Sequence, residues 1–158
     1  MIKKTVKLIL IIFWMGLIFS FSSDNADQSN KKSDGIIITM VEAFYGRDLS
    51  IDEKDKWINY LVVPVRKGAH FSVYLVLGLL IFSFLLEFMK NGYKSILLSI
   101  GISFLYACSD EIHQLFVPGR SGNILDVLID TVGASVGVLV FSFIVRKCCK
   151  YEQKERTC

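Results

Sequence analysis

Four blocks of apolar residues, each close to the length of a membrane-spanning helix, constrain the fold of this chain more than any other feature. They cover about residues 8–22, 68–89, 95–114 and 124–145. Hydrophobic residues make up 53% of the chain and are grouped in these blocks. Because a helix needs about 20 mainly apolar residues to cross a bilayer core, the blocks predict an all-α integral membrane protein with about four transmembrane helices.

The basic residues indicate how these helices are oriented. With the N-terminus in the cytoplasm, ten Lys and Arg residues but only three acidic residues fall on the cytoplasmic side, as the positive-inside rule favours. We therefore expect a multi-pass protein of the bacterial cell membrane with both termini cytoplasmic. Its membrane domain would cover residues 1–147, with an outer loop at 23–66, followed by a basic tail at 148–158. The tail suits anionic lipid, and nucleic-acid binding is not predicted.

The first apolar block has a second interpretation. Three lysines precede it, and residues 20–22 could serve as the cleavage site of a signal peptide. The large side chains of Phe19 and Phe21 favour an uncleaved signal anchor instead. Under either interpretation, the segment targets the chain to the membrane.

The outer loop is predicted to contain one or two short amphipathic helices. Residues 22–34 are polar and are interpreted as a flexible linker, whereas residues 35–45 are apolar but too short to span a membrane. Ser50 and Glu53 match a capping box, which predicts a helix that ends at Pro64. This helix could lie at the membrane interface or pack on the protein's own surface.

Polar and small residues fall on one stripe of each of the last three apolar helices. Helix positions three, four and seven apart share a face, and this spacing defines the stripes. They are Lys67, His70, Tyr74 and Gly78; Ser99, Ser103, Tyr106, Asp110 and His113, with Gln114 at the edge; and Asp126, Asp130, Gly133 and Gly137.

The outer end of each stripe is its most polar part, so we expect the three helices to face one another there. Gly133 and Gly137 form a small-xxx-small pattern that permits close helix contact, and it places Asp126 and Asp130 at the same seam. Buried carboxylates are costly without partners. The expected counter-charges are Arg66, Lys67 and Arg120.

Ionisable groups cost roughly 2.5–3.5 kcal/mol each at the centre of a bilayer, so this cluster indicates a function or a structural brace. It could ligate a divalent metal, perform acid–base catalysis through a His–Asp pair, conduct protons or ions, or act as a salt-bridged plug that fixes helix register. The zinc motif HExxH, a nucleophile elbow and a P-loop are all absent. No metal or cofactor is therefore predicted, and no residue is assigned a catalytic role.

Three segments, 66–74, 109–120 and 126–134, together resemble the VanZ-like family of small bacterial membrane proteins. The resemblance covers about residues 1–146. It implies a multi-helix membrane protein and a link to low-level resistance to glycopeptide antibiotics of the teicoplanin type. The residues that match the family's polar positions are Arg66, Lys67, His70, Tyr74, Asp110, Glu111, His113, Gln114, Arg120, Asp126 and Asp130.

The resemblance and the polar stripes suggest a non-enzymatic protein whose outer-face pocket binds or shields a cell-envelope component. The expected partners are membrane lipid and either a glycopeptide antibiotic or a cell-wall precursor. Two alternatives stay open: a membrane enzyme that acts on a lipid-linked precursor through His70 or His113, and a structural or partner-binding subunit. The structural alternative predicts that exchanging the charges of Arg120 and Asp126 restores folding.

Overall fold

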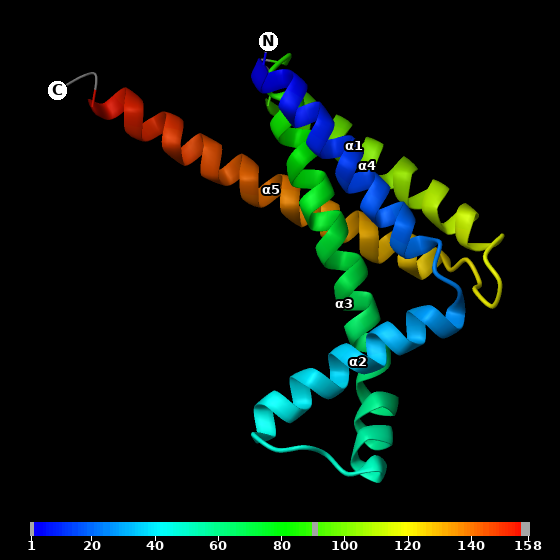
Figure 1. Cartoon of the computed structure of the whole chain (residues 1–158). Coiled ribbons are helices and arrows are strands. Elements are labelled where there is room, and N and C mark those ends of the chain that lie inside the picture. Colours follow the sequence, from blue (N-terminus) through cyan, green and yellow to red (C-terminus); the bar gives the residue numbers. More distant parts are fainter. Residues whose placement is uncertain (1, 90–91, 156–158) are drawn as a thin grey trace.

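The computed structural model describes residues 2–89 and 92–155, with side chains as far as Lys147, and this part of the chain is helical with no strands (Figure 1). All helices except α2 are long and apolar enough to cross a membrane, which confirms the predicted fold class. Only 17–39% of each apolar stretch is buried within the protein, so most of its surface is left for lipid. The helices are α1 (Ile2–Ser22), α2 (Ala26–Tyr45), α3 (Ile51–Leu85), α4 (Gly92–Gln114) and α5 (Ile124–Glu155).

Helix α3 is one continuous helix, so the predicted break at Pro64 is wrong. Its 35 residues extend for about 52 Å at 1.5 Å per residue, far beyond a bilayer core of about 30 Å. Proline removes one backbone donor and leaves the carbonyl of Tyr60 without its helical partner. Tyr60 is 74% exposed, so the helix surface at this position faces away from the protein. The predicted amphipathic helix and the second span are therefore a single element.

The predicted flexible linker over residues 22–34 is also wrong. Helix α2 begins at Ala26, after Asn25 accepts a hydrogen bond from the Gln28 N–H at 2.9 Å. It ends at Gly46, whose φ of 67° lies in the left-handed region that glycine adopts readily. The predicted outer loop is thus a helical hairpin, made of α2 and the first half of α3.

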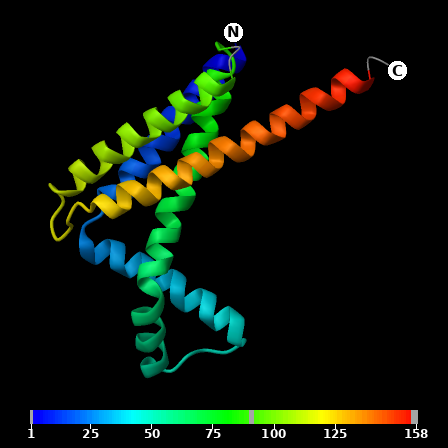
Figure 2. The same ribbon diagram turned by 180° about the vertical axis from the view of Figure 1, so that it is seen from behind.

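The hairpin has a small hydrophobic core of its own. Ile37 and Val41 of α2 are buried with Leu49, and Trp57 and Leu61 of α3 pack against them. In both views of the whole chain, the hairpin extends from one end of the bundle of α1, α3, α4 and α5 (Figures 1 and 2). We refer to this end as the hairpin end.

Side chains cap the starts of α3 and α5, and the cap of α3 is the one predicted above. The side chains and backbone amides of Ser50 and Glu53 form the predicted capping box at the start of α3. At the start of α5, the Asn123 side chain accepts a hydrogen bond from the Leu125 N–H at 3.0 Å. Both caps satisfy backbone donors that a helix start leaves unpaired.

Helices α3 and α5 cross in close contact, as the small-xxx-small pattern predicts. A methyl group on Gly133 would collide with the carbonyl oxygen of Phe71, and one on Gly137 would collide with that of Leu75. The crossing places the first half of α5 against the middle of α3. The second half of α5 diverges from α1 and α4 (Figure 2).

Helix α1 is an integral part of the bundle. The indole nitrogen of Trp14 donates a hydrogen bond to the Val73 carbonyl of α3 at 2.8 Å. On its other side, the Tyr106 hydroxyl of α4 donates to the Met15 carbonyl at 2.7 Å. These contacts fix α1 between α3 and α4, near the hairpin end.

Candidate functional site

The three polar stripes meet at the hairpin end of the bundle. Helix α3 contributes His70, α4 contributes Asp110 and Glu111, and α5 contributes Asp130. Asp130 is completely buried, while Asp110 and Glu111 are only 4% and 5% exposed. Three acidic residues are thus removed from solvent next to one histidine that remains partly accessible.

His70 is the basic partner of Asp130. Its Nδ1 lies 3.3 Å from Asp130 Oδ1, which is within ion-pair distance. Beyond this ion-pair contact, neither carboxylate oxygen of Asp130 has a hydrogen-bond partner among the described residues. Buried polar atoms are normally paired, so this carboxylate is an exception that requires an explanation.

The two acidic residues of α4 are only partly satisfied. Glu111 Oε2 accepts a hydrogen bond from the Asn123 N–H at 2.7 Å, while Gln114 Nε2 donates to Asp110 Oδ2 at a long 3.5 Å. The second oxygen of each carboxylate lacks a partner within the described chain, as does the buried Tyr74 hydroxyl. The unpaired atoms therefore come from all three stripes.

The three basic residues expected as counter-charges contact different kinds of partner. Lys67 pairs with Asp126 at 2.5 Å, as the stripes suggested. Arg66 instead donates to the Asn30 side chain at 3.4 Å, and Arg120 donates to backbone carbonyls. Among the described residues, no carboxylate lies within ion-pair distance of either arginine. Both arginines are therefore available to an anion.

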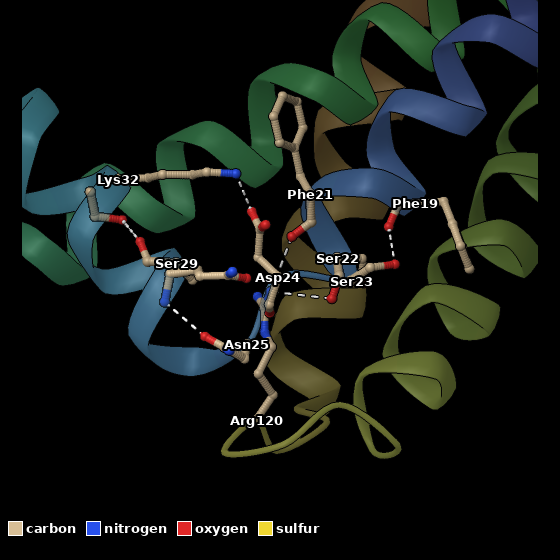
Figure 3. Close-up of polar contacts among 11 residues, drawn as sticks. Phe19, Phe21, Ser22, Ser23, Asp24, Asn25, Ser29, Lys32 and Arg120 are labelled. Atoms are coloured by element: carbon tan, nitrogen blue, oxygen red, sulfur yellow. Dashed lines mark hydrogen bonds and ion pairs between the residues drawn. The ribbon is translucent and has the colours of Figure 1, made fainter.

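Arg120 reaches from the loop after α4 to the junction of α1 and α2. Its Nη1 lies 3.3 Å from each of the carbonyl oxygens of Phe21, Ser22 and Asp24 (Figure 3). Partial burial lowers the pKa of Arg120, and the nearby charge of Arg66 lowers it further. The guanidinium group is thus a partly desolvated cation that is oriented by neutral acceptors.

His113 does not join the buried acids. Its ring stacks on Phe19 of α1 with centroids 4.4 Å apart, and its Nε2 lies 3.2 Å from the Ser23 hydroxyl. Tyr106 also turns to α1, where its hydroxyl bonds the Met15 carbonyl. Of the two histidines in the chain, only His70 therefore belongs to the cluster.

Two adjoining cavities open at this cluster, with volumes of about 250 Å³ and 360 Å³. The smaller one is lined by apolar side chains of α1, α2 and α3 together with polar side chains that include Asp110 and Lys32. The larger one is lined mainly by polar side chains, including Lys67 and Asp126. The residues that line both cavities are Arg66, His70, Gln114 and Arg120.

The contribution of α1 and α2 to these cavities was not predicted from the sequence. Ser22, Asp24 and Lys32 line the smaller cavity, and Asn30 lines the larger one. These residues fall in the segment that was interpreted as a linker. A signal for the helix was present, because a capping Asn25 followed by Gln28 matches a helix start.

The VanZ/LLP1 family model matches residues 7–145 of the chain. The chain belongs to the VanZ/LLP1 family. No curated protein and no solved structure shows a significant match. The VanZ/LLP1 match includes every described residue of the buried cluster and both cavities. With four helices long and apolar enough to span a bilayer, this VanZ/LLP1 protein is a multi-pass membrane protein.

The site of this VanZ/LLP1 protein offers three kinds of interaction. The apolar side chains of the smaller cavity can hold a hydrocarbon chain, and Arg66 and Arg120 can bind an anionic group. His70 and Asp130 can exchange a proton with a bound molecule, because the imidazole lines both cavities.

Proposed function

We propose that this VanZ/LLP1 protein binds an amphiphilic component of the cell envelope in the cavities at the hairpin end, and thereby contributes to low-level resistance to glycopeptides of the teicoplanin type. The main support is one cavity whose lining combines apolar side chains of α1, α2 and α3 with polar and charged side chains such as Asp110 and Arg120. An envelope lipid, a lipid-linked cell-wall precursor and a lipid-anchored glycopeptide all combine a hydrocarbon chain with a polar group. Such a ligand could be bound or shielded there.

The apolar side chains of the smaller cavity support the hydrocarbon part of the proposal. They are Ile18 and Phe21 of α1, Ile36 of α2, and Val65 and Val73 of α3. These side chains belong to helices that also expose large hydrophobic residues to the surroundings. The apolar part of the cavity lining therefore comes from helices that also present hydrophobic side chains to the bilayer.

The arginines support the headgroup part. Arg66 and Arg120 line both cavities and contact only neutral acceptors in the described chain. A phosphate or carboxylate placed between them would form charge-assisted hydrogen bonds, which are about twice as strong as neutral ones. The proposed headgroup is therefore anionic.

The proposed orientation places this site where such a ligand is found. With both termini in the cytoplasm, the α2–α3 hairpin and the cavities lie on the outer side of the membrane. Lys3, Lys4 and Lys7 at one end of α1 support this orientation through the positive-inside rule. Glycopeptides act on this side of the membrane.

A teicoplanin susceptibility assay in a sensitive Gram-positive host tests the proposal. The natural chain is expected to raise the inhibitory concentration, and Ala69→Phe is expected to abolish the increase because Ala69 lines the apolar cavity. Gly68→Phe is the matched control, because a side chain at the neighbouring Gly68 points into open space and lines neither cavity. Membrane abundance is compared by blot for all three chains.

Equal protection by the Ala69→Phe chain at equal abundance would contradict a role for the cavity. If the natural chain gives no protection, the resistance part of the proposal is wrong. Binding of an anionic envelope lipid by the purified chain, measured with and without Arg120→Gln, then tests the remaining part. We expect binding that weakens in the variant.

A second candidate function is a membrane enzyme that acts on a lipid-linked precursor. The observation in its favour is the contact between His70 and Asp130 beside the cavities, because a carboxylate can orient an imidazole for proton transfer. Turnover of such a lipid by the purified chain, lost in His70→Ala and kept in His113→Ala, would support it. Turnover that survives in His70→Ala would exclude this pair from the mechanism.

A further inference from the structure

We propose that His70, Glu111 and Asp130 form a binding site for one divalent transition-metal cation. The three side chains come from α3, α4 and α5, and each offers one ligand atom. These atoms all lie within 4.8 Å of one another. The ligands are far apart in the sequence, which explains why local spacing did not indicate a metal.

The unpaired carboxylate of Asp130 is the observation that points to a ligand. Its side chain is 0% exposed, and neither of its oxygens has a hydrogen-bond partner in the described chain. Glu111 is 5% exposed and leaves Oε1 unpaired, although its Oε2 is held by the Asn123 amide. Because an unpaired buried carboxylate is very costly, a cation between these oxygens would be strongly stabilising.

Apart from His70, which is itself one of the three ligands, the nearby cations Lys67 and Arg120 are not placed to neutralise these two acids. Lys67 pairs with Asp126, one turn before Asp130 on α5. Arg120 is directed to carbonyls at the junction of α1 and α2 (Figure 3). Two carboxylates and a neutral imidazole carry a charge that one divalent ion would balance.

The donor atoms indicate the class of metal. One imidazole nitrogen and two carboxylate oxygens, without a thiolate, suit Zn²⁺ or Mn²⁺ better than Cu⁺ or an iron–sulfur cluster. In a tetrahedral site with bonds of about 2.1 Å, neighbouring ligand atoms stand about 3.4 Å apart. Atoms separated by as much as 4.8 Å would therefore approach one another by up to about 1.4 Å as the ion binds. Three protein ligands also leave a coordination position for water or another molecule.

Metal binding by the full-length chain purified in detergent tests this proposal. After removal of metal with a chelator, the chain is dialysed against Zn²⁺ or Mn²⁺, and bound metal is measured by elemental analysis. We expect one ion per chain. Loss of a residue that only hydrogen-bonds a metal ligand lowers metal affinity by roughly 10-fold or more. Asp130→Asn and His70→Ala each remove a ligand itself, so we expect them to lower metal affinity by more than this. Asp130→Asn preserves the side-chain shape, and its helicity is checked by circular dichroism.

His113→Ala and Asp52→Asn are the matched controls, because neither residue belongs to the three-residue group or lines either cavity. Both are expected to bind metal as the natural chain does. Metal should raise the melting temperature of the natural chain and of both controls, but not that of Asp130→Asn. A natural chain that binds neither ion, or an Asp130→Asn chain that binds like the natural one, would overturn the proposal. The result is independent of the susceptibility assay.

Discussion

Lys67 Nζ lies 2.5 Å from Asp126 Oδ1, and this ion pair joins the middle of α3 to the first turn of α5 at the hairpin end. The two side chains are 36% and 23% exposed, so water weakens their attraction. A pair of this kind contributes about 1 kcal/mol or less to the free energy of unfolding. Asp126 gains further stabilisation from its place at a helix N-terminus.

We predict that Lys67→Met and Asp126→Asn each lower the stability of the purified protein and that their effects are coupled. In a double-mutant cycle the coupling should be up to about 1 kcal/mol, because each change removes the same contact. The charge exchange Lys67→Asp with Asp126→Lys should recover only part of the loss, since a lysine in the first turn opposes the helix dipole. Unfolding in detergent, followed by circular dichroism, measures these effects.

Arg120 provides the comparison for this cycle. It was predicted to pair with Asp126, but the structure directs it to backbone carbonyls at the junction of α1 and α2. Arg120→Gln and Asp126→Asn are therefore expected to have additive effects, and exchanging their charges should rescue nothing. Coupling of Arg120 with Asp126 as strong as that of Lys67 would contradict the observed pairing.

We also predict that the contact between α3 and α5 does not tolerate a side chain at Gly137. A methyl group there would overlap the Leu75 carbonyl, which is backbone and cannot rotate away. Gly137→Ala should therefore destabilise the protein by about 1–3 kcal/mol, the usual cost of overpacking. Thermal unfolding in detergent measures the loss.

Gly101→Ala on α4 is the control for this substitution. A methyl group at Gly101 would meet no atom within 4 Å, so only the higher helix propensity of alanine remains. This change should leave the protein unchanged or stabilise it by up to about 1 kcal/mol. Equal destabilisation at both glycines would show that the crossing is not specially tight.

The sequence predicted the seam between α3 and α5 because a helical stripe needs only a fixed angle per residue. It could not predict how the end of α4 is covered. Counting positions puts Asp110 and His113 on one stripe, yet His113 is stacked on Phe19 of α1, and Glu111 is covered near the start of α5. A stripe predicts which side of a helix is buried. It does not predict which neighbouring helix packs against the residues at the edge of that side.

The hairpin of α2 and α3 was missed for a different reason. Polar composition favoured a linker over residues 22–34, and Pro64 favoured a helix end. In the structure, burial of Ile37 and Val41 against α3 stabilises both segments as helix. Tertiary packing of this kind outweighs local propensity, and a single sequence does not reveal it.

The loop between α2 and α3 should depend on pH through Glu42. The backbone N–H of Leu49 donates to Glu42 Oε1 at 3.1 Å and lowers the pKa of this carboxyl, and Lys54 lowers it further. A lowered folded-state pKa gives stability that is present above the unfolded pKa of about 4.3 and is lost as the pH falls through the folded value. The hydrogen-exchange protection factor of the Leu49 amide is therefore expected to decrease below pH 4.

Glu42→Gln separates this effect from general acid unfolding. The variant keeps an acceptor for Leu49 but cannot be protonated in this range, so its protection factor should be lower at neutral pH and nearly constant on acidification. Amides in the middle of α5, such as that of Ala134, serve as an internal reference. If they lose protection at the same pH as Leu49, the effect is global and does not arise from Glu42.

The orientation of the chain can be determined with single cysteines. We predict that Phe44→Cys, at a position 86% exposed near the end of α2, reacts with a membrane-impermeant maleimide on intact cells. Lys147→Cys, exposed on α5, should react only after the membrane is permeabilised, because the positive-inside rule places this basic end in the cytoplasm. Both are made in a chain whose four native cysteines are replaced by serine, and that parent chain is the control for background labelling. The reverse pattern would place the cavities on the cytoplasmic side and would exclude direct contact with an extracellular glycopeptide.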